Sequence, residues 1–586
     1  MTGQAPGPPA RGRSGRLLAW VAMAAVTLAA WAALTWPLAL RMDGIWVQFS
    51  RFDPGSNPAA RYQPDMLIGG DHLQNAFIQT VVIDNVRHLR NPFLDLYEGA
   101  AGPAPLRTSS LDVPWTPLVA LLWPLVGLQA AYNATLVLST LATGLAAFGW
   151  LRRHTRWQLL AGAGALAYTF TPHHMSQLVS HFNGVMWWVF PASLWALEAA
   201  MERHREGRRW RWPAVAVGAL AVLVAASGEY HLSLYLTALL CFLTAFELAS
   251  AWLARRPLPW APAATVAGGV ALGVAYTLVV FTYVFRGDVQ GGNGDYGEVL
   301  RFAPGSALWL VRRDLARFGE GMVYVGWAVV ALAAVGLVAA LAGRGRPRAA
   351  RPYAVLAVPL LFFTLGPAAD LGGFRPYRFL AEHVSVVGLQ RVPQRLMVLT
   401  SLVLVLLAVC ALDLAAGWLL AARPRLAPVA AAALLAGTAL LLADYVVGRN
   451  VVMDNLAGNR VVAALRAAGD RAGPILGVPV REHVSATSYV AALSRRRALN
   501  AYNQTPAPWL NRRMRQLQPI SRGRAGPTAL EVLRGTGATQ VVVLNEPHVY
   551  RPGQWRQVVD KLVASGHFRL ALTDGPFALL ELTGPP

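Results

Sequence analysis

The sequence predicts a mainly α-helical, polytopic transmembrane bundle of about 11 spans, followed by a small C-terminal α/β domain outside the cytoplasm. Three observations lead to this fold class. Only 14% of the 586 residues are charged, whereas soluble domains average about 25%. Apolar runs of spanning length recur between residues 17 and 448. From about residue 449 the composition becomes that of a soluble domain.

The first apolar run predicts a transmembrane helix that the mature protein retains. Residues 17–40 carry no charge and number about 24, and a spanning helix needs about 20. The run exceeds the apolar core of a signal peptide and lacks an obvious small-residue cleavage site. Arg11, Arg13 and Arg16 precede it, which places the N-terminal tail, residues 1–16, in the cytoplasm.

Ten further spans follow from the later apolar runs. We predict them at residues 131–150, 158–172, 183–200, 213–227, 232–253, 259–285, 322–343, 352–368, 394–419 and 427–447. The proline-rich run 114–126 fits a re-entrant or interfacial segment. Basic clusters at 152–154, 203–211, 255–256, 344–351 and 423–425 then all face the cytoplasm, as the positive-inside rule requires. The transmembrane domain covers residues 17–448, and its large first outer loop covers residues 41–130.

The C-terminal segment, residues 449–586, predicts a soluble domain on the outer side. We expect strands at 474–480, 540–544, 568–572 and 577–582, and an amphipathic helix at 555–565. This domain has 18 basic residues against 8 acidic ones. Anionic membrane lipid or a phosphate-bearing substrate would account for that excess, and so would an arginine-rich surface without function.

Composition also excludes some classes of protein. The formal net charge is +22, but the arginines gather at the ends of apolar runs, which indicates membrane topology and no nucleic-acid partner. Cys241 and Cys410 both lie within apolar runs, so they provide neither a disulfide framework nor a metal-binding spacing.

Asp71 is the main catalytic candidate. It lies in Gly69-Gly70-Asp71-His72, inside the first outer loop and just before a predicted helix. An acid directly outside the first span of a membrane protein suggests chemistry on a substrate at that face. The alternative is an N-cap, in which the carboxylate accepts backbone N–H bonds from the helix.

Two other outer segments carry polar residues beside apolar runs. His173-His174 and His181 suggest a metal site or contacts with lipid headgroups, although their spacing matches no standard zinc site. Glu229 and His231 interrupt two apolar runs, as a functional ionisable pair or a solvated turn would.

Charged residues also mark two late outer segments. The loop 286–320 is rich in glycine and carries Asp288, Asp295, Glu298 and the run 312–314. Arg391 and Arg395 enter the tenth span from outside, four residues apart and therefore on one helical face. Two guanidinium groups there would suit phosphate oxygens, or they would pair with carboxylates of the loops.

Together these features resemble the GT-C superfamily of polytopic membrane glycosyltransferases, and most closely its bacterial YfhO-like families. The similar motifs are Gly70-Asp71 followed by Asn91-Pro92-Phe93, then His181-Phe182-Asn183, and Arg391-Val392-Pro393-Gln394-Arg395. The resemblance extends over nearly the whole chain, and the order of the motifs is more specific than any one of them.

The resemblance implies an inverting glycosyltransferase of the bacterial cytoplasmic membrane. It would move a sugar from a polyprenyl-phosphate carrier to a glycan, lipid or protein acceptor on the outer face. Asp71 would act as general base on the acceptor hydroxyl. Arg391 and Arg395 would stabilise the lipid phosphate. The remaining candidates for substrate contact are His72, His181, Asn183, Glu229 and His231.

Two further points stay open in the sequence. Some GT-C relatives use a divalent cation and others use none. Here His72, and not a second acid, follows Asp71, so we predict no metal-binding residues and keep a divalent cation only as an alternative. The alternative functions are a transporter or flippase of lipid-linked glycans and an inactive GT-C relative in envelope assembly. Transporters often contain internal repeats, and the sequence has no clear repeat.

Overall fold

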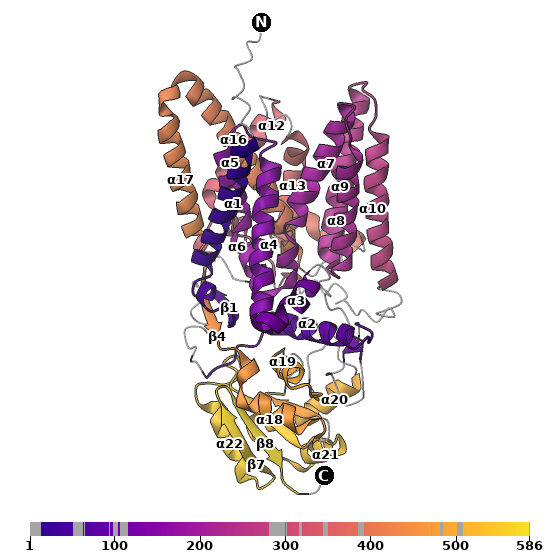
Figure 1. Ribbon diagram of the computed structural model, residues 1–586, viewed down its shortest axis with the longest axis vertical. Coiled ribbons are helices and arrows are strands. Elements are labelled where there is room, and N and C mark those ends of the chain that lie inside the picture. Colours follow the sequence, from indigo (N-terminus) through magenta and orange to yellow (C-terminus); the bar gives the residue numbers. More distant parts are fainter. Residues whose placement is uncertain are drawn as a thin grey trace.

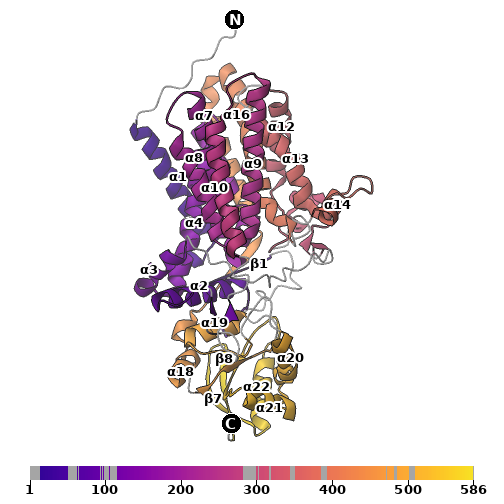
Figure 2. The ribbon, with the colours of Figure 1, turned by 90° about the vertical axis from the view of Figure 1, so that its right-hand side faces the viewer.

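The structure is a computed structural model in which a helical body and a smaller, sheet-containing lower body follow one another along the long axis (Figure 1, Figure 2). Helix α1 begins at the end of the helical body that lies farthest from the lower body. The structure describes residues 13–50, 63, 65–92, 94–95, 97, 104–105, 115–280, 299–300, 302–315, 319–343, 350–384, 392–469, 472–480, 485–500 and 508–584.

Within these ranges, seven helices are long and apolar enough to cross a membrane. They are α1 (Arg13–Leu34), α4 (Leu128–Leu151), α9 (Tyr230–Leu253), α10 (Trp260–Val279), α13 (Arg351–Leu365), α16 (Met397–Ala422) and α17 (Ala427–Asp444). The helical body also contains α5 (Gln158–Thr169), α7 (Val189–Arg205), α8 (Arg211–Ala226) and α12 (Trp327–Leu341).

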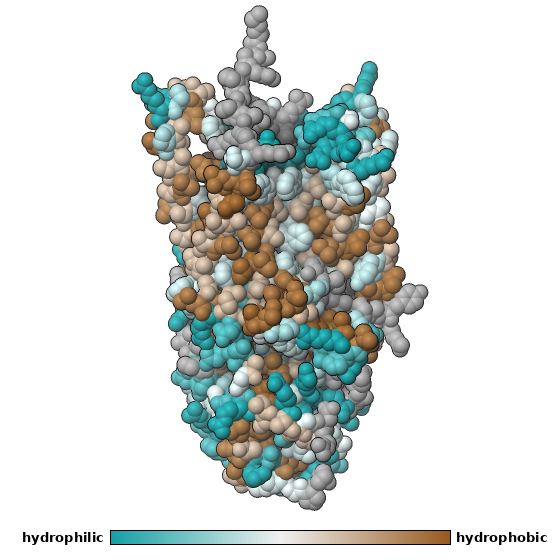
Figure 3. Space-filling model, in the orientation of Figure 1, coloured by the Kyte–Doolittle hydropathy of each residue, from teal (hydrophilic) through white to brown (hydrophobic). Residues whose placement is uncertain are grey.

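The helical body has the surface of a multi-pass membrane protein. Hydrophobic residues cover its side, and hydrophilic residues gather at the far helix ends and around the junction with the lower body (Figure 3). Each predicted span overlaps one of the helices named above. The mainly α-helical, polytopic fold is therefore confirmed, and the number of about 11 crossings stays a prediction.

Helix α16 forms the centre of the helical body. In its most apolar 18-residue stretch 89% of the residues are buried, and the helix packs against α12, α13 and α5. A Cβ on Gly336 of α12 would lie 1.9 Å from the carbonyl oxygen of Leu407, so only glycine allows this close approach to α16. Helix α17 stands at the edge of the body in Figure 1, and no residue of its most apolar 18-residue stretch is buried.

The first outer loop joins the two bodies. Strand β1 (Ile45–Ser50) pairs antiparallel with β4 (Gly448–Met453), which brings together the beginning and the end of the predicted transmembrane domain. Helix α2 (Asp71–Arg87) runs across the lower end of the helical body (Figure 1) and packs against α19 (Ser485–Ser494) of the lower body.

Three small elements complete this junction. Helix α3 (Thr116–Val126), the segment predicted to be re-entrant or interfacial, packs on α4 and exposes Leu121 and Leu125. Strands β2 (Leu94–Asp95) and β3 (Ala104–Pro105) pair with each other.

The lower body is built on a four-stranded sheet with the order β5-β6-β8-β7. Its strands are β5 (Ile475–Val478), β6 (Gln540–Leu544), β7 (Phe568–Asp574) and β8 (Phe577–Leu582). β5 and β6 are parallel, and the other pairs are antiparallel. The helices are α18 (Arg460–Ala468), α19 (Ser485–Ser494), α20 (Pro508–Leu517), α21 (Pro527–Gly535) and α22 (Gln554–Ala564). The predicted strands and the predicted helix at 555–565 are all confirmed.

Candidate active site

Asp71 is the first residue of α2, and its side chain contacts another loop. Gly70 occupies the N-cap position, and no side chain caps the helix there. The N-cap interpretation of Asp71 is therefore wrong. Its Oδ2 lies 3.0 Å from Nε2 of His181, and 42% of its side chain is exposed. Asp71 is thus an accessible carboxylate held by a histidine.

His181 links Asp71 to a second acid. It follows α6 (Pro172–Ser180) in an extended backbone conformation, and its side chain is largely buried. Its Nε2 lies 2.7 Å from Oε1 of Glu320, so one N–H group faces two carboxylates. The sequence motif around His181 therefore places a histidine between the first outer loop and the loop before α12.

Glu320 in turn forms an ion pair with Arg395. Arg395 belongs to the short 3-10 helix η9 (Pro393–Leu396), which leads into the central helix α16. Both side chains are nearly buried, with exposed fractions of 9% for Glu320 and 12% for Arg395. The alternative that Arg395 pairs with a loop carboxylate is confirmed.

Glu320 is not among the residues predicted from the sequence. The predicted charges of the loop 286–320 are others, and this acid precedes the apolar run that starts at Met322. The signal that could have found it is an acid at the mouth of a predicted span, on the same side as Asp71 and Arg395.

A chain of ion pairs with alternating charge joins Asp71, His181, Glu320 and Arg395, and we name it the charge relay. Burial by itself lowers the pKa of His181, but the charge of Glu320 and hydrogen bonds to Asp71 and Glu320 raise that pKa to about 9. Burial disfavours the Glu320 carboxylate, yet Arg395 and His181 hold its pKa well below the ordinary value. At neutral pH the imidazole is therefore protonated and Glu320 is ionised.

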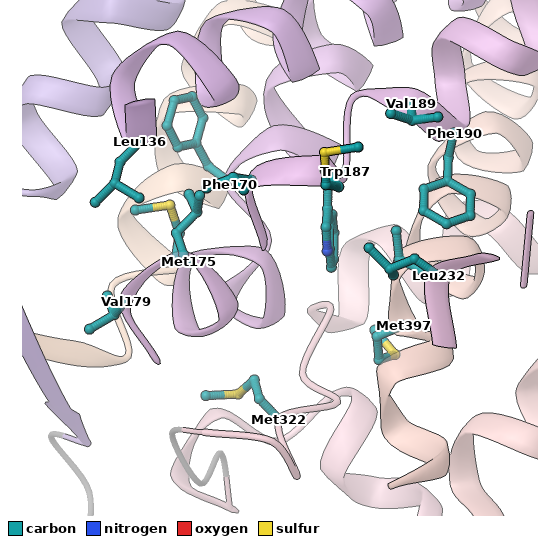
Figure 4. Packing of buried hydrophobic residues seen from close by; sticks show 14 of the residues in the cluster. Leu136, Phe170, Met175, Val179, Trp187, Val189, Phe190, Leu232, Met322 and Met397 are labelled. Atoms are coloured by element: carbon teal, nitrogen blue, oxygen red, sulfur yellow. The ribbon is translucent and has the colours of Figure 1, made fainter. Parts of the chain in front are cut away.

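Hydrophobic packing lies directly beside the charge relay. Met322 and Met397 each lie two residues after a member of the relay, and both are fully buried. Figure 4 shows them near Trp187 and Leu232 in one hydrophobic cluster. An apolar environment weakens screening by water, so the ion pairs of the relay interact more strongly than surface pairs do.

We expect the stability of the protein to fall as the pH rises through about 9. Folding raises the pKa of His181 from its ordinary 6.5 to about 9, so its ion pairs contribute fully below about pH 6.5 and are lost above about 9. The contribution is on the order of 3 kcal/mol. Thermal denaturation across this range measures it, and His181→Gln should flatten the profile. An equally steep decline in the variant would contradict the expectation.

The predicted segment around Glu229 reaches the same region. Glu229 precedes α9, and its charge acts on Arg395. Tyr235, one turn into α9, lies within electrostatic reach of both Arg395 and Glu320. His231 is buried, and its ring centre lies 3.7 Å from that of Tyr230. The structure thus brings Glu229 close to the charge relay and places His231 on the adjacent turn of α9.

His72 lies at the junction with the lower body. It is buried, and the charges of Asp71 and of His548 in the lower body both act on it. Burial lowers the pKa of His72 to about 4, so this side chain is neutral at physiological pH. His72 is therefore a buried, neutral neighbour of Asp71.

His173 and His174 are structural residues of the helical body. Nδ1 of His173 lies 2.6 Å from the carbonyl oxygen of Met322, and the His174 ring stacks on Trp187 at 4.4 Å. Both are buried, which separates them from lipid headgroups, and His174 turns both ring nitrogens to backbone carbonyl oxygens, which leaves it no nitrogen for a metal ion. In the described part of the chain, no three His, Cys, Asp or Glu side chains are arranged to hold a metal ion. His181 and Arg395 already neutralise the two carboxylates, so the relay does not fit a cation.

Other predicted residues lie outside the described part of the structure. Arg391, Phe93 and the loop acids Asp288, Asp295 and Glu298 are among them. The side chains of Phe182 and Asn183 are also not described, although their backbone forms the 3-10 helix η3 (Phe182–Met186).

Solved structures show which fold this is. No family model and no curated protein sequence match the chain. The arabinofuranosyltransferase AftD from Mycobacteria aligns with a TM-score of 0.55 and 16% identity, over 98% of this chain and 40% of its own. The oligosaccharyltransferase AglB from Archaeoglobus fulgidus, in complex with an inhibitory peptide and a dolichol-phosphate, gives 0.52 and 11%, over 96% and 73%.

A third structure, the Archaeoglobus fulgidus oligosaccharyltransferase tethered to an acceptor peptide, gives a TM-score of 0.51 and 11% identity, over 95% of this chain and 72% of its own. The chain spans about two fifths of the length of AftD. These similar structures are membrane glycosyltransferases of the GT-C type, and the likeness shows that this chain has the GT-C fold.

Proposed function

We propose that this protein is a membrane glycosyltransferase that moves a sugar from a polyprenyl-phosphate donor to an acceptor on the outer face of the membrane. The observation that carries the proposal is an exposed carboxylate, Asp71, held by a buried charge relay at the lower end of a GT-C fold. One similar structure contains dolichol-phosphate, and another contains an acceptor peptide, which supports a lipid-linked donor and a separate acceptor.

The chemistry is a single displacement at the anomeric carbon. The acceptor oxygen forms a bond to that carbon while the bond from carbon to the phosphate oxygen breaks, and the configuration inverts. Asp71 takes the proton of the acceptor hydroxyl as the bond forms, which is ordinary general-base catalysis. The polyprenyl phosphate leaves with the electron pair and is a good leaving group without protonation.

The leaving phosphate needs positive charge more than it needs a proton. We assign this task to Arg395, whose buried Nε–H has no hydrogen-bond partner among the residues that the structure describes, together with Arg391. The ion pair with Glu320 orients the guanidinium group of Arg395. Glu229, His231, His72, His181 and Asn183 remain proposed substrate contacts, with His181 acting through its hold on Asp71.

The proposal includes an orientation and a location. Residues 1–16 lie in the cytoplasm, residues 17–448 form the transmembrane domain, and residues 449–586 form a domain outside. The location is the bacterial cytoplasmic membrane. The long apolar helices and the hydrophobic side of the helical body support a membrane location.

Proteoliposomes test this proposal directly. The purified chain is reconstituted with undecaprenyl phosphate carrying a radiolabelled sugar, for a panel of sugars, together with envelope glycans and lipids as acceptors. We expect label to pass to an acceptor and free undecaprenyl phosphate to appear, only where the C-terminal domain faces the donor. Label that crosses the bilayer while still on the lipid would instead support a flippase. If the label is neither transferred to an acceptor nor moved across the bilayer with any donor, the result would support an inactive relative.

A further inference from the structure

We infer that Ser485 and Glu546 of the lower body are positioning residues for Asp71. Ser485 holds Gly70 by a hydrogen bond, and the Glu546 side chain lies against Gly69. These are the two residues before Asp71, so the contacts fix the point at which α2 begins. This inference rests on the proposed function, in which Asp71 is the general base. It gives the lower body a specific task in the reaction.

The chain before Asp71 is attached to the lower body at several points. The backbone N–H of Leu67 donates to the carbonyl oxygen of Asn545 at 2.9 Å, and the Asn545 side-chain amide donates to the Asp65 carbonyl oxygen at 2.7 Å. The Ile68 N–H also points at the sulfur of Met453, 3.2 Å away. Hydrogen bonds therefore attach the segment before Asp71 to the lower body.

The two glycines carry this attachment up to the helix. The N–H of Gly70 donates to Oγ of Ser485, the first residue of α19, at 2.8 Å. A Cβ on Gly69 would lie 2.9 Å from Oε1 of Glu546, so the end of that side chain lies close behind the turn. Ser485 and Glu546 are both buried, with exposed fractions of 7% and 5%.

This arrangement replaces the usual device at the start of a helix. A capping side chain normally fixes the first turn, but Gly70 has no side chain, and no side chain caps α2 at this position. The hydroxyl of Ser485 instead anchors the N-cap residue from outside. Because Gly70 directly precedes Asp71 in the chain, a movement of Gly70 would displace the Asp71 carboxylate from Nε2 of His181.

Ser485→Ala tests the inference, with Tyr489→Phe as the matched control. Tyr489 lies on the same helix and its hydroxyl donates to Gln129 of α4 at 3.2 Å, so each variant loses one hydrogen bond between the two bodies. We expect sugar transfer by Ser485→Ala to fall roughly tenfold to a hundredfold, because a misplacement of about 1 Å costs about that factor. Tyr489→Phe should keep the wild-type rate.

A titration of His181 distinguishes positioning from general destabilisation. NMR of the full chain with labelled histidine follows it, and His181→Gln identifies its resonance. The groups that act on His181 are Glu320 and Asp71, with His173 nearby. Asp71 helps to raise the pKa of His181, so Ser485→Ala should lower that pKa while Tyr489→Phe leaves it unchanged. Equal titrations in all three proteins would overturn the inference.

A second set of variants covers the case in which Ser485→Ala fails to fold. Gly69→Ala forces Oε1 of the buried Glu546 to shift and should impair transfer. Glu546→Asp shortens that side chain, so the double variant Gly69→Ala/Glu546→Asp should recover part of the transfer. Failure of Gly69→Ala to change transfer or the His181 titration would also overturn the inference. The titration needs no turnover. A wild-type protein that transfers no sugar, yet shows the shift in Ser485→Ala, would therefore refute the proposed function and support the positioning role.

Discussion

Replacing Asp71 by Asn is expected to lower the rate of sugar transfer by a factor of about 10²–10⁴, the usual contribution of a general base. Asn keeps the size of Asp, and its amide oxygen can still accept a hydrogen bond from Nε2 of His181, so the local geometry should survive. The variant loses only the ability to take the proton of the acceptor hydroxyl.

The kinetic signature of this variant is specific. We expect kcat to fall and the KM for the polyprenyl-phosphate donor to stay near its wild-type value, because the donor phosphate is assigned to Arg395. Initial rates with the radiolabelled donor in proteoliposomes measure both. Asp84→Asn is the matched control, since Asp84 is another carboxylate of α2 and contacts Tyr97 at 3.2 Å, away from the charge relay. If Asp71→Asn transfers sugar at more than about a tenth of the wild-type rate, Asp71 is not the general base.

Breaking the ion pair between Glu320 and Arg395 should produce the largest loss of stability. We expect Arg395→Met to lower the free energy of unfolding by about 3–5 kcal/mol, because it leaves the buried Glu320 with only His181 as a partner. Glu320→Gln leaves Arg395 buried without its ion pair and should have a similar effect. The double variant should lose less than the sum, since it leaves no member of this pair charged.

Denaturant titration in detergent micelles measures these four proteins as a double-mutant cycle. The control is Arg569→Met, which breaks an exposed ion pair with Glu581 on the lower body, where the arginine side chain is 73% exposed. Surface pairs contribute at most about 1 kcal/mol, so this variant should remain close to the wild type. Additive losses in the cycle would show that Glu320 and Arg395 do not act as a pair.

The helices illustrate what the sequence can predict. Apolar runs predicted α16 and α17 equally well, because both are strongly apolar and long enough to span a membrane. The structure then buries 89% of the most apolar stretch of α16 and none of that of α17. Lipid and protein interior are both apolar, so hydropathy identifies a spanning helix but does not tell which helix lies at the centre.

The candidate site shows the same division. Asp71, His181, Glu229 and Arg395 could each be predicted, because an ionisable residue beside an apolar run is unusual enough to be noticed. Their connection could not, since Glu320 and Arg395 are 75 residues apart and meet only through the fold. Nor could the sequence exclude the N-cap alternative for Asp71, because the hydrogen bond that holds Gly70 comes from Ser485, in another part of the chain.

The amino-acid sequence by itself determined that this protein is a mainly α-helical membrane protein with an α/β lower body, and which segments between the apolar runs carry charge. These properties depend on local composition and periodicity, which a single chain displays directly. Only the tertiary structure decided that Asp71 is the exposed end of a charge relay, and that the lower body holds the turn before it. Ion pairs and hydrogen bonds between distant segments depend on distances of a few ångströms, and only the packed chain sets those distances.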